Sequence, residues 1–206
     1  MPDAAPDPIG WWARFRDADP GRTTLTAVVS DAYPSGSVVD QPDDRCPPGW
    51  VVSVVSAGER PVQVALAQAG LPLIWWVVVP EPAADLAATT VLAFSDERYG
   101  HGQVLDAESA RLAGVRGEHQ VGAVRWRPGS GVVHQLYVAP QHRRRGIGGA
   151  LVTAAFALQF AADGVRLHGD GRRTDDGEAW RAHLPGHLQH WFEPWSQRLP
   201  PMTPGG

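Results

Sequence analysis

Residues 132–151 of this 206-residue chain read VVHQLYVAPQHRRRGIGGAL. The first part, Val132–Val138, is rich in β-branched and aromatic residues, which is typical of a buried strand. Pro140 follows almost at once and has no backbone N–H to donate to a strand ladder. The sequence therefore predicts a strand that ends before Pro140 and leads into a loop with several glycines.

The segment after the loop has the spacing of a helix. Small or apolar residues recur every three or four positions at Leu151, Ala155, Leu158 and Ala162, which is the interval of one helical face. Gly164 follows, and glycine is a common residue just beyond a helix C-terminus. The predicted unit is a strand, a loop and a helix, with the loop at the helix N-terminus.

The loop is well suited to an anion. A helix N-terminus offers backbone N–H groups without intrahelical partners, and the helix dipole adds partial positive charge there. Arginine side chains add charge-assisted bonds to phosphate oxygens, while glycines remove side chains that would block a ligand. The residues concerned are Arg143, Arg144, Arg145, Gly146, Gly148 and Gly149. We predict that this loop binds a diphosphate.

Two other phosphate motifs do not fit this loop. A dinucleotide-binding turn has G-x-G-x-x-G directly after its strand, but Leu151 fills the third glycine position and seven residues separate Val138 from Gly146. A P-loop requires lysine, and all 18 basic residues of this chain are arginine. Both motifs are therefore excluded.

The same residues resemble the acyl-CoA-binding motif of the GNAT superfamily of N-acetyltransferases, where a strand ending in valine is followed by proline and by R-x-x-G-x-G at a helix start. Arg143, Gly146 and Gly148 hold the three fixed positions. The resemblance implies an α/β, acyl-CoA N-acyltransferase (GNAT) fold, with a central mixed, mostly antiparallel sheet flanked by helices. It also implies acetyl-CoA (CoA) as cofactor. The cofactor-binding residues would be Leu136, Tyr137, Val138, Arg143, Arg144, Arg145, Gly146, Ile147, Gly148, Gly149 and Ala150.

Two histidines are the candidate catalytic residues. Several members of the superfamily carry histidine or glutamate four residues before the strand-ending valine, and His134 holds this position. An ordinary pKa near 6.5 suits histidine to act as a base, although a packing histidine bonded to a backbone carbonyl is an equally good interpretation. Many relatives also use a tyrosine as general acid in the helix after the next strand. This chain has tyrosine only at positions 33, 99 and 137, so His168 or water is the expected substitute.

Strand geometry gives a further expectation for the base. In a regular strand alternate residues share a face, so His134 should point the same way as Leu136 and Val138. Gln135 and Tyr137 should then point the other way, unless a bulge interrupts the alternation.

The rest of the chain is expected to form short strands and helices in three parts. We predict strands at residues 23–30, 51–56, 71–79 and 165–168, and a hairpin of strands 120–126 and 131–138. Helices are expected at 60–68, 81–88, 106–113 and 174–183. Residues 1–48 form a Pro-rich, partly irregular N-terminal extension, residues 49–190 the GNAT acetyltransferase domain, and residues 191–206 a C-terminal tail.

Composition argues against several kinds of partner. A net charge of −4 gives no general attraction to nucleic acid or to an anionic membrane, and no apolar run is long enough to span a bilayer. A lone Cys46 excludes an intrachain disulfide and favours a cytoplasmic location. We expect no metal site, because Pro185 and Gly186 separate His183 from the nearby histidines. The oligomeric state is left open, a homodimer included.

Three functional hypotheses follow. The first is an N-acetyltransferase that moves an acetyl group from acetyl-CoA to an amine of unknown identity, on a small molecule or a protein. The second is a non-catalytic acyl-CoA-binding or sensor domain whose N-terminal half binds a partner. The third is a structural protein that uses the arginine loop as a partner-binding patch.

Overall fold

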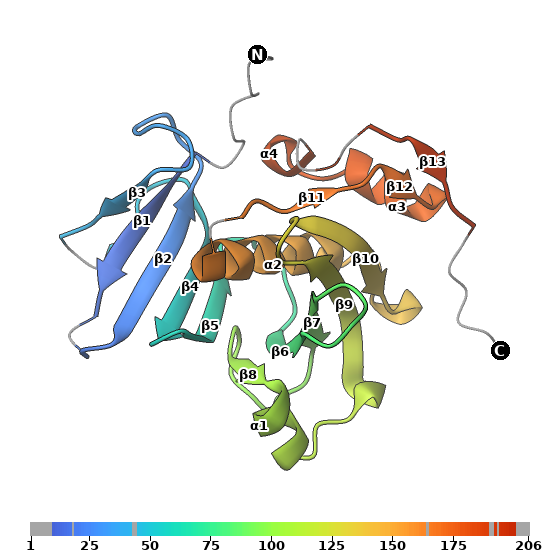
Figure 1. The fold of residues 1–206 in the computed structure, drawn as a ribbon, viewed down its shortest axis with the longest axis horizontal. Helices are drawn as coiled ribbons and strands as arrows, with labels where there is room; N and C mark the ends of the chain where they lie inside the picture. Colours follow the sequence, from blue (N-terminus) through green and yellow to red (C-terminus); the bar gives the residue numbers. More distant parts are fainter. Residues whose placement is uncertain are drawn as a thin grey trace.

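The structure, a computed structural model of the chain, is described for residues 10–17, 19–42, 45–163, 165–189, 192 and 194–200. Its centre is helix α2 (Ile147–Asp163), which lies between two β-sheets (Figure 1). Strands β4 and β5 contact the helix from one side, and strands β7, β9 and β10 contact it from the other. The fold is therefore α/β with three layers, and the predicted helix is confirmed. Gly164, its predicted end, lies outside the described residues.

The N-terminal sheet has five strands in the order β3-β1-β2-β4-β5. Its neighbouring strands are antiparallel except for the parallel pair β1 and β3. The bounds are β1 (Trp11–Arg16), β2 (Arg22–Val28), β3 (Val38–Asp40), β4 (Trp50–Ala57) and β5 (Arg60–Leu66). The expected Pro-rich, partly irregular extension thus supplies strands β1, β2 and β3, and their sheet continues across residue 48 into β4 and β5.

Strand β5 replaces a predicted helix. The helix expected at 60–68 was wrong, because this segment pairs along its length with β4 in a tight hairpin. Gly58 supplies the left-handed turn residue, with φ of 59°. Val64 is buried against α2 while Gln63 beside it is exposed, which is the alternation of a strand.

The second sheet has six strands in the order β11-β10-β9-β7-β6-β8. Strands β10, β9, β7 and β6 are antiparallel neighbours, and the outer pairs β6–β8 and β10–β11 are parallel. The bounds are β6 (Trp75–Glu81), β7 (Ala88–Phe94), β8 (Val104–Asp106), β9 (Gln120–Arg127), β10 (Val132–Val138) and β11 (His168–Gly169). The mixed, mostly antiparallel sheet and its central hairpin agree with the sequence. The helix expected at 81–88 was wrong, because this segment turns β6 into β7.

Short helices complete both ends of the second sheet. Helix α1 (Ala107–Leu112) lies at the expected position, and the carboxylate of Asp106 caps it by accepting the Ser109 N–H at 2.7 Å. Helix α3 (Asp175–Ala182) is capped by Thr174, also as expected. The other elements are the 3₁₀ turns η1 (Gly117–His119) and η2 (Pro140–His142), α4 (Gly186–Gln189), and the parallel pair β12 (Arg172–Arg173) and β13 (Gln197–Arg198).

Helix α2 has a sheet on each of two sides, and a helix buried in this way needs apolar or small residues all round. Its residues 147–148 and 150–159 are buried. Trp12 of β1 stacks on Phe156 and Phe160, with ring centroids 5.5 and 4.1 Å apart. None of the helices among the described residues combines the length and apolar character needed to cross a bilayer.

The two sheets also touch along a seam between β5 and the segment before β8. The Val64 N–H donates to the Gly102 carbonyl at 2.8 Å, and Gln63 and Gln103 form an isolated antiparallel bridge. Gly102 has φ of 80°, and a Cβ there would collide with the Val64 carbonyl oxygen. Glycine is required at this position because of both its backbone conformation and this close approach. The seam fixes the N-terminal sheet relative to the second sheet.

Candidate functional site

The predicted anion-binding loop lies where the sequence placed it, between β10 and the N-terminus of α2. Arg144 and Gly146 have φ of 60° and 77°, and Arg144 is the single non-glycine residue with positive φ in the described part of the chain. A left-handed arginine costs of order 1 kcal/mol. Turns of this kind bring successive backbone N–H groups together in a concave surface that suits an anion. The strained arginine is thus consistent with a binding loop.

Two of the loop glycines lie against side chains from other elements. A Cβ on Gly146 would collide with the side-chain nitrogen of Gln68, and a Cβ on Gly148 would lie 2.7 Å from the indole nitrogen of Trp180. We expected these glycines to leave space for a ligand. The structure shows that side chains from β5–β6 and from α3 fill the space instead, so the loop is held from two sides.

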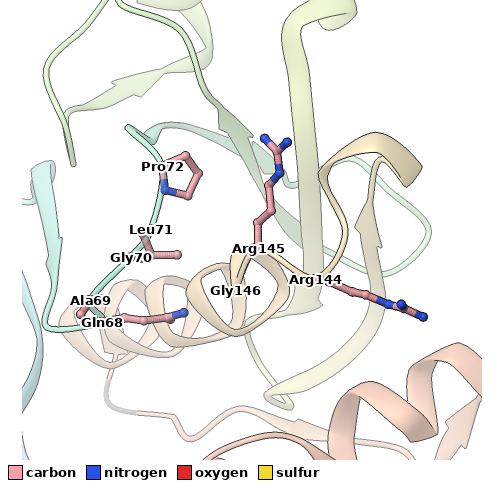
Figure 2. Close-up of a pocket in the computed structure, with 8 residues that line it drawn as sticks. All are labelled: Gln68, Ala69, Gly70, Leu71, Pro72, Arg144, Arg145 and Gly146. Atoms are coloured by element: carbon pink, nitrogen blue, oxygen red, sulfur yellow. The ribbon is translucent and has the colours of Figure 1, made fainter.

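A cavity of about 510 Å³ opens beside the loop (Figure 2). It lies between the connection from β5 to β6 and the N-terminus of α2. Its lining residues are Gln68, Ala69, Gly70, Leu71, Pro72, Arg144, Arg145 and Gly146. The lining residues include two arginines and no carboxylate. Neither Arg144 nor Arg145 has an ion pair within the described residues, so their charge is available to a ligand.

The third arginine of the loop has a different role. The Arg143 Nε donates to the Val138 carbonyl at 3.3 Å, and its Nη1 lies 3.1 Å from a carboxylate oxygen of Asp176. It therefore links the end of β10 to the first turn of α3. Both side chains of the ion pair are exposed, so solvent screens their attraction.

Strand β10 has an open edge next to the loop. It pairs with β11 only at Val132 and Val133, because β11 ends at Gly169. Cofactor candidates Leu136, Tyr137 and Val138 all lie on β10 beyond this pairing, and the loop candidates, Ile147 and Ala150 included, follow after it. An open strand edge presents backbone donors and acceptors to an extended ligand.

A β-bulge changes the predicted position of His134. The register with β9 shifts between Val133 and Gln135, so His134 is the extra residue. Leu136 pairs with Val124 and packs on the α2 side, as Val138 also does. The charged residues that influence His134 lie elsewhere. Arg125 and Arg127 are on the face of β9 opposite to α2, and Asp170 follows β11. We expected His134 to share a face with Leu136 and Val138 unless a bulge interrupted the strand. The bulge is present, so this expectation does not apply.

The pKa of His134 lies below its ordinary value of 6.5. The largest cause is partial removal of its ring from water, although the side chain as a whole is exposed. The charges of Arg125 and Arg127 lower it further, while Asp170 and Glu81 act in the opposite direction. At neutral pH His134 is therefore unprotonated and able to accept a proton.

The second histidine lies at the far end of the strand pair. His168 pairs across from Val132, and its Nε2 is 3.2 Å from the Ser130 carbonyl in the β9–β10 turn. Its Nδ1 is 3.4 Å from the Gly169 carbonyl. These contacts attach His168 to the hairpin turn rather than to the loop end of β10. A structural role thus accounts for its contacts.

Sequence reasoning missed three side chains that surround the loop. Gln68 belongs to a connection we expected to be the end of a helix. Asp176 and Trp180 lie on the helix expected at 174–183, whose contact with the loop was not expected. No local pattern marks Gln68, because its proximity to Gly146 arises from the seam between the sheets. The acidic residues of the first turn of α3 and the arginines of the loop carry opposite charges. This charge complementarity is the one signal in the sequence that could have indicated their contact.

Within the described residues, no three His, Cys, Asp or Glu side chains gather as metal ligands do.

Comparison with known proteins gives one family. Residues 104–183 match the family model described as "Acetyltransferase (GNAT) domain". The matched segment begins at β8, includes β9, β10, the loop and α2, and ends just after α3. It confirms the resemblance to the GNAT superfamily and supports acyl transfer from acetyl-CoA as the general class of activity. No curated protein and no solved structure matched the chain.

Proposed function

We propose that this protein is an N-acetyltransferase that transfers the acetyl group of acetyl-CoA to an amine. One observation carries the proposal: within the family-matched segment, an arginine-rich loop at the start of a buried helix adjoins the open edge of β10. Such an arrangement offers donors for a diphosphate and, beside them, backbone groups for an extended amide-containing chain.

The residues present fit CoA. Arg144 and Arg145 line a cavity without a carboxylate, which suits the negative charge of a diphosphate. The backbone of Leu136, Tyr137 and Val138 would hold the pantetheine arm along β10. When bound, acetyl-CoA supplies the acetyl group as an activated thioester.

Positioning would supply much of the catalytic effect. Binding along β10 would fix the thioester relative to an incoming amine and remove much of the entropic cost of bringing the two together. His134, unprotonated at neutral pH, would accept the proton of the attacking amine directly or through water. Trp180 has no proton of suitable acidity, so solvent is the expected proton donor to the departing thiolate.

The alternative is a non-catalytic acyl-CoA-binding or sensor domain. Two observations favour it: the helix α3 carries no tyrosine, and the Val138 carbonyl already accepts a hydrogen bond from Arg143. In that case the N-terminal half of the chain, which forms the N-terminal sheet, would bind a partner.

Calorimetry with CoA, followed by turnover assays over a panel of amines, separates the hypotheses. CoA binding together with acetylation of at least one amine supports the proposed enzyme. Binding without turnover across small-molecule and peptide amines supports the sensor domain. Absence of CoA binding would reject both and favour a partner-binding arginine patch.

A further inference from the structure

The connection between β5 and β6 passes directly over the arginine loop. Residues 67–74 form neither helix nor strand, and Gly70 makes a left-handed turn with φ of 76°. Leu71 fixes the connection in place, because it packs against the main hydrophobic core and would lie 3.3 Å from a Cβ on Gly146. The connection therefore forms one wall of the cavity, although it lies outside the family-matched segment.

Gln68 brings a polar group from this wall to the loop. Its carboxamide nitrogen lies against Gly146, and its oxygen would be 3.9 Å from a Cβ on Gly149. Figure 2 shows the side chain extending from the wall toward the first turn of α2. The carboxamide makes no hydrogen bond within the described residues. A primary amide has two N–H donors, so this group is free to bind an acceptor.

The groups around Gln68 determine what kind of acceptor fits. Arg145 contributes an unpaired guanidinium on the same cavity, and Figure 2 shows Arg144 directed away from the wall. The helix N-terminus adds further partial positive charge. Every charged group that lines the cavity is thus a cation, and a phosphate group is the acceptor of matching charge.

We infer that Gln68 is a cofactor-binding residue contributed by the N-terminal half of the chain, and that its Nε2 donates a hydrogen bond to the diphosphate of CoA. The inference rests on the proposed function and extends it. It gives the β5–β6 connection a direct part in cofactor binding, so that residues 104–183 supply only one side of the diphosphate site.

The test compares CoA affinity of the full-length wild type with Gln68→Ala, Gln68→Glu and the matched control Gln63→Glu. Gln63 is also an exposed glutamine, five positions earlier on β5. We expect Gln68→Ala to weaken CoA binding about three- to ten-fold, through loss of one hydrogen bond from an exposed side chain. Gln68→Glu should weaken it by about ten-fold or more, since it adds repulsion, and less so at high salt. Gln63→Glu should change it less than about two-fold.

Two further ligands locate the contact. Dephospho-CoA lacks the 3′-phosphate and keeps the diphosphate, so the loss in Gln68→Glu should match the loss seen with CoA. Pantetheine lacks both the diphosphate and the 3′-phosphate. Its affinity, measured by direct binding or by inhibition of turnover, should therefore be the same for Gln68→Glu and the wild type. Thermal unfolding of each variant confirms that it is folded.

The outcomes are distinguishable. If wild type binds CoA and both Gln68 variants bind equally well, the inference is wrong while the proposed function stands. A loss that disappears with dephospho-CoA would also overturn the assignment, because Gln68 would then contact the 3′-phosphate. If wild type does not bind CoA, the proposed function itself fails.

Discussion

The residue Arg143 shows how one side chain of a binding loop can be held by its own protein. Its guanidinium bonds both to the end of β10 and to Asp176 on α3, whereas Arg144 and Arg145 have no ion pair within the described residues. A diphosphate would have to compete with the Asp176 carboxylate for Arg143. Asp176 therefore opposes an anionic ligand by its charge and by holding Arg143.

We expect Asp176→Asn to tighten CoA binding about two- to five-fold, since an exposed ion pair of this kind contributes roughly 0.2–1 kcal/mol. Asp175→Asn is the matched control, because it removes the same charge from the same helical turn while Asp175 pairs with Arg198. Calorimetry at two salt concentrations measures the effect, which should shrink at high salt. Equal gains in both variants would reveal a general charge effect and no specific role for Asp176.

The lowered pKa of His134 predicts the pH dependence of the reaction. With its lowered pKa, the imidazole of His134 stays unprotonated below pH 6.5. An acetyl-transfer rate that needs the unprotonated imidazole is therefore retained at pH 7 and falls only as the pH drops through the lowered pKa. His134→Gln should abolish this acidic limb and lower kcat/KM on the order of 10²-fold, with CoA affinity kept. The pH–rate profile with an acetylated amine provides the measurement. A folded variant with an unchanged rate and profile would leave His134 a packing residue only.

The same shift has a consequence for stability. A histidine whose folded-state pKa is below its unfolded value binds its proton more readily in the unfolded chain. His134 therefore has no effect on stability well above pH 6.5, and it destabilises the fold increasingly as the pH falls through 6.5 toward the lowered pKa. The variant His134→Gln lacks this dependence.

Helix α2 is the element on which both sheets depend. Its Phe156 is 1% exposed and stacks on Trp12 of the N-terminal sheet. Truncation would remove the stacking on Trp12 and leave a cavity in the core, which the sheet cannot fill because its strands are fixed by their ladder.

We expect Phe156→Ala to lower the free energy of unfolding by about 3–5 kcal/mol. Leu112→Ala provides the control, because Leu112 of α1 is 71% exposed and its truncation should change stability by less than about 0.5 kcal/mol. Denaturant-induced unfolding followed by tryptophan fluorescence measures both. A loss below about 1 kcal/mol for Phe156→Ala would contradict the central position of α2 between the sheets.

The sequence predicted the elements whose signals are local. The β9–β10 hairpin has its turn residues in place, the loop has its glycines, and Asp106 and Thr174 are typical helix caps. Strand β5 was mistaken for a helix, because what makes it a strand is pairing with β4 rather than its own composition. The bulge at His134 depends on the register with β9, which no spacing within β10 reveals.

Across the whole molecule, the largest feature that the sequence did not reveal is the assembly of the N-terminal sheet, of which only β2 and β4 were expected as strands. Its strands β1 and β3 pair in parallel although many residues separate them, and its inner face is completed by a helix from the other half of the chain. Long-range pairing of this kind leaves little trace in local composition. The seam at Gly102 is where the two halves are joined through backbone contacts.

Gly102→Ala should therefore lower the free energy of unfolding by about 2 kcal/mol or more, through a left-handed φ and a collision with the Val64 carbonyl. Gly117→Ala is the control, because a Cβ at Gly117 meets nothing within 4 Å. Thermal unfolding compares the two variants. Similar stabilities would show that the sheets are joined by α2 alone.

The position of α2 between the sheets also has a consequence for the timing of synthesis. The N-terminal sheet is complete in the nascent chain at Leu66, but its inner residues Trp12, Val52 and Val64 wait for a helix that begins at Ile147. About eighty residues must be translated in between, at roughly 5–20 residues per second. For several seconds the ribosome therefore carries a sheet with an uncovered apolar face, and we expect chaperones that bind such surfaces to associate with the nascent chain until α2 emerges.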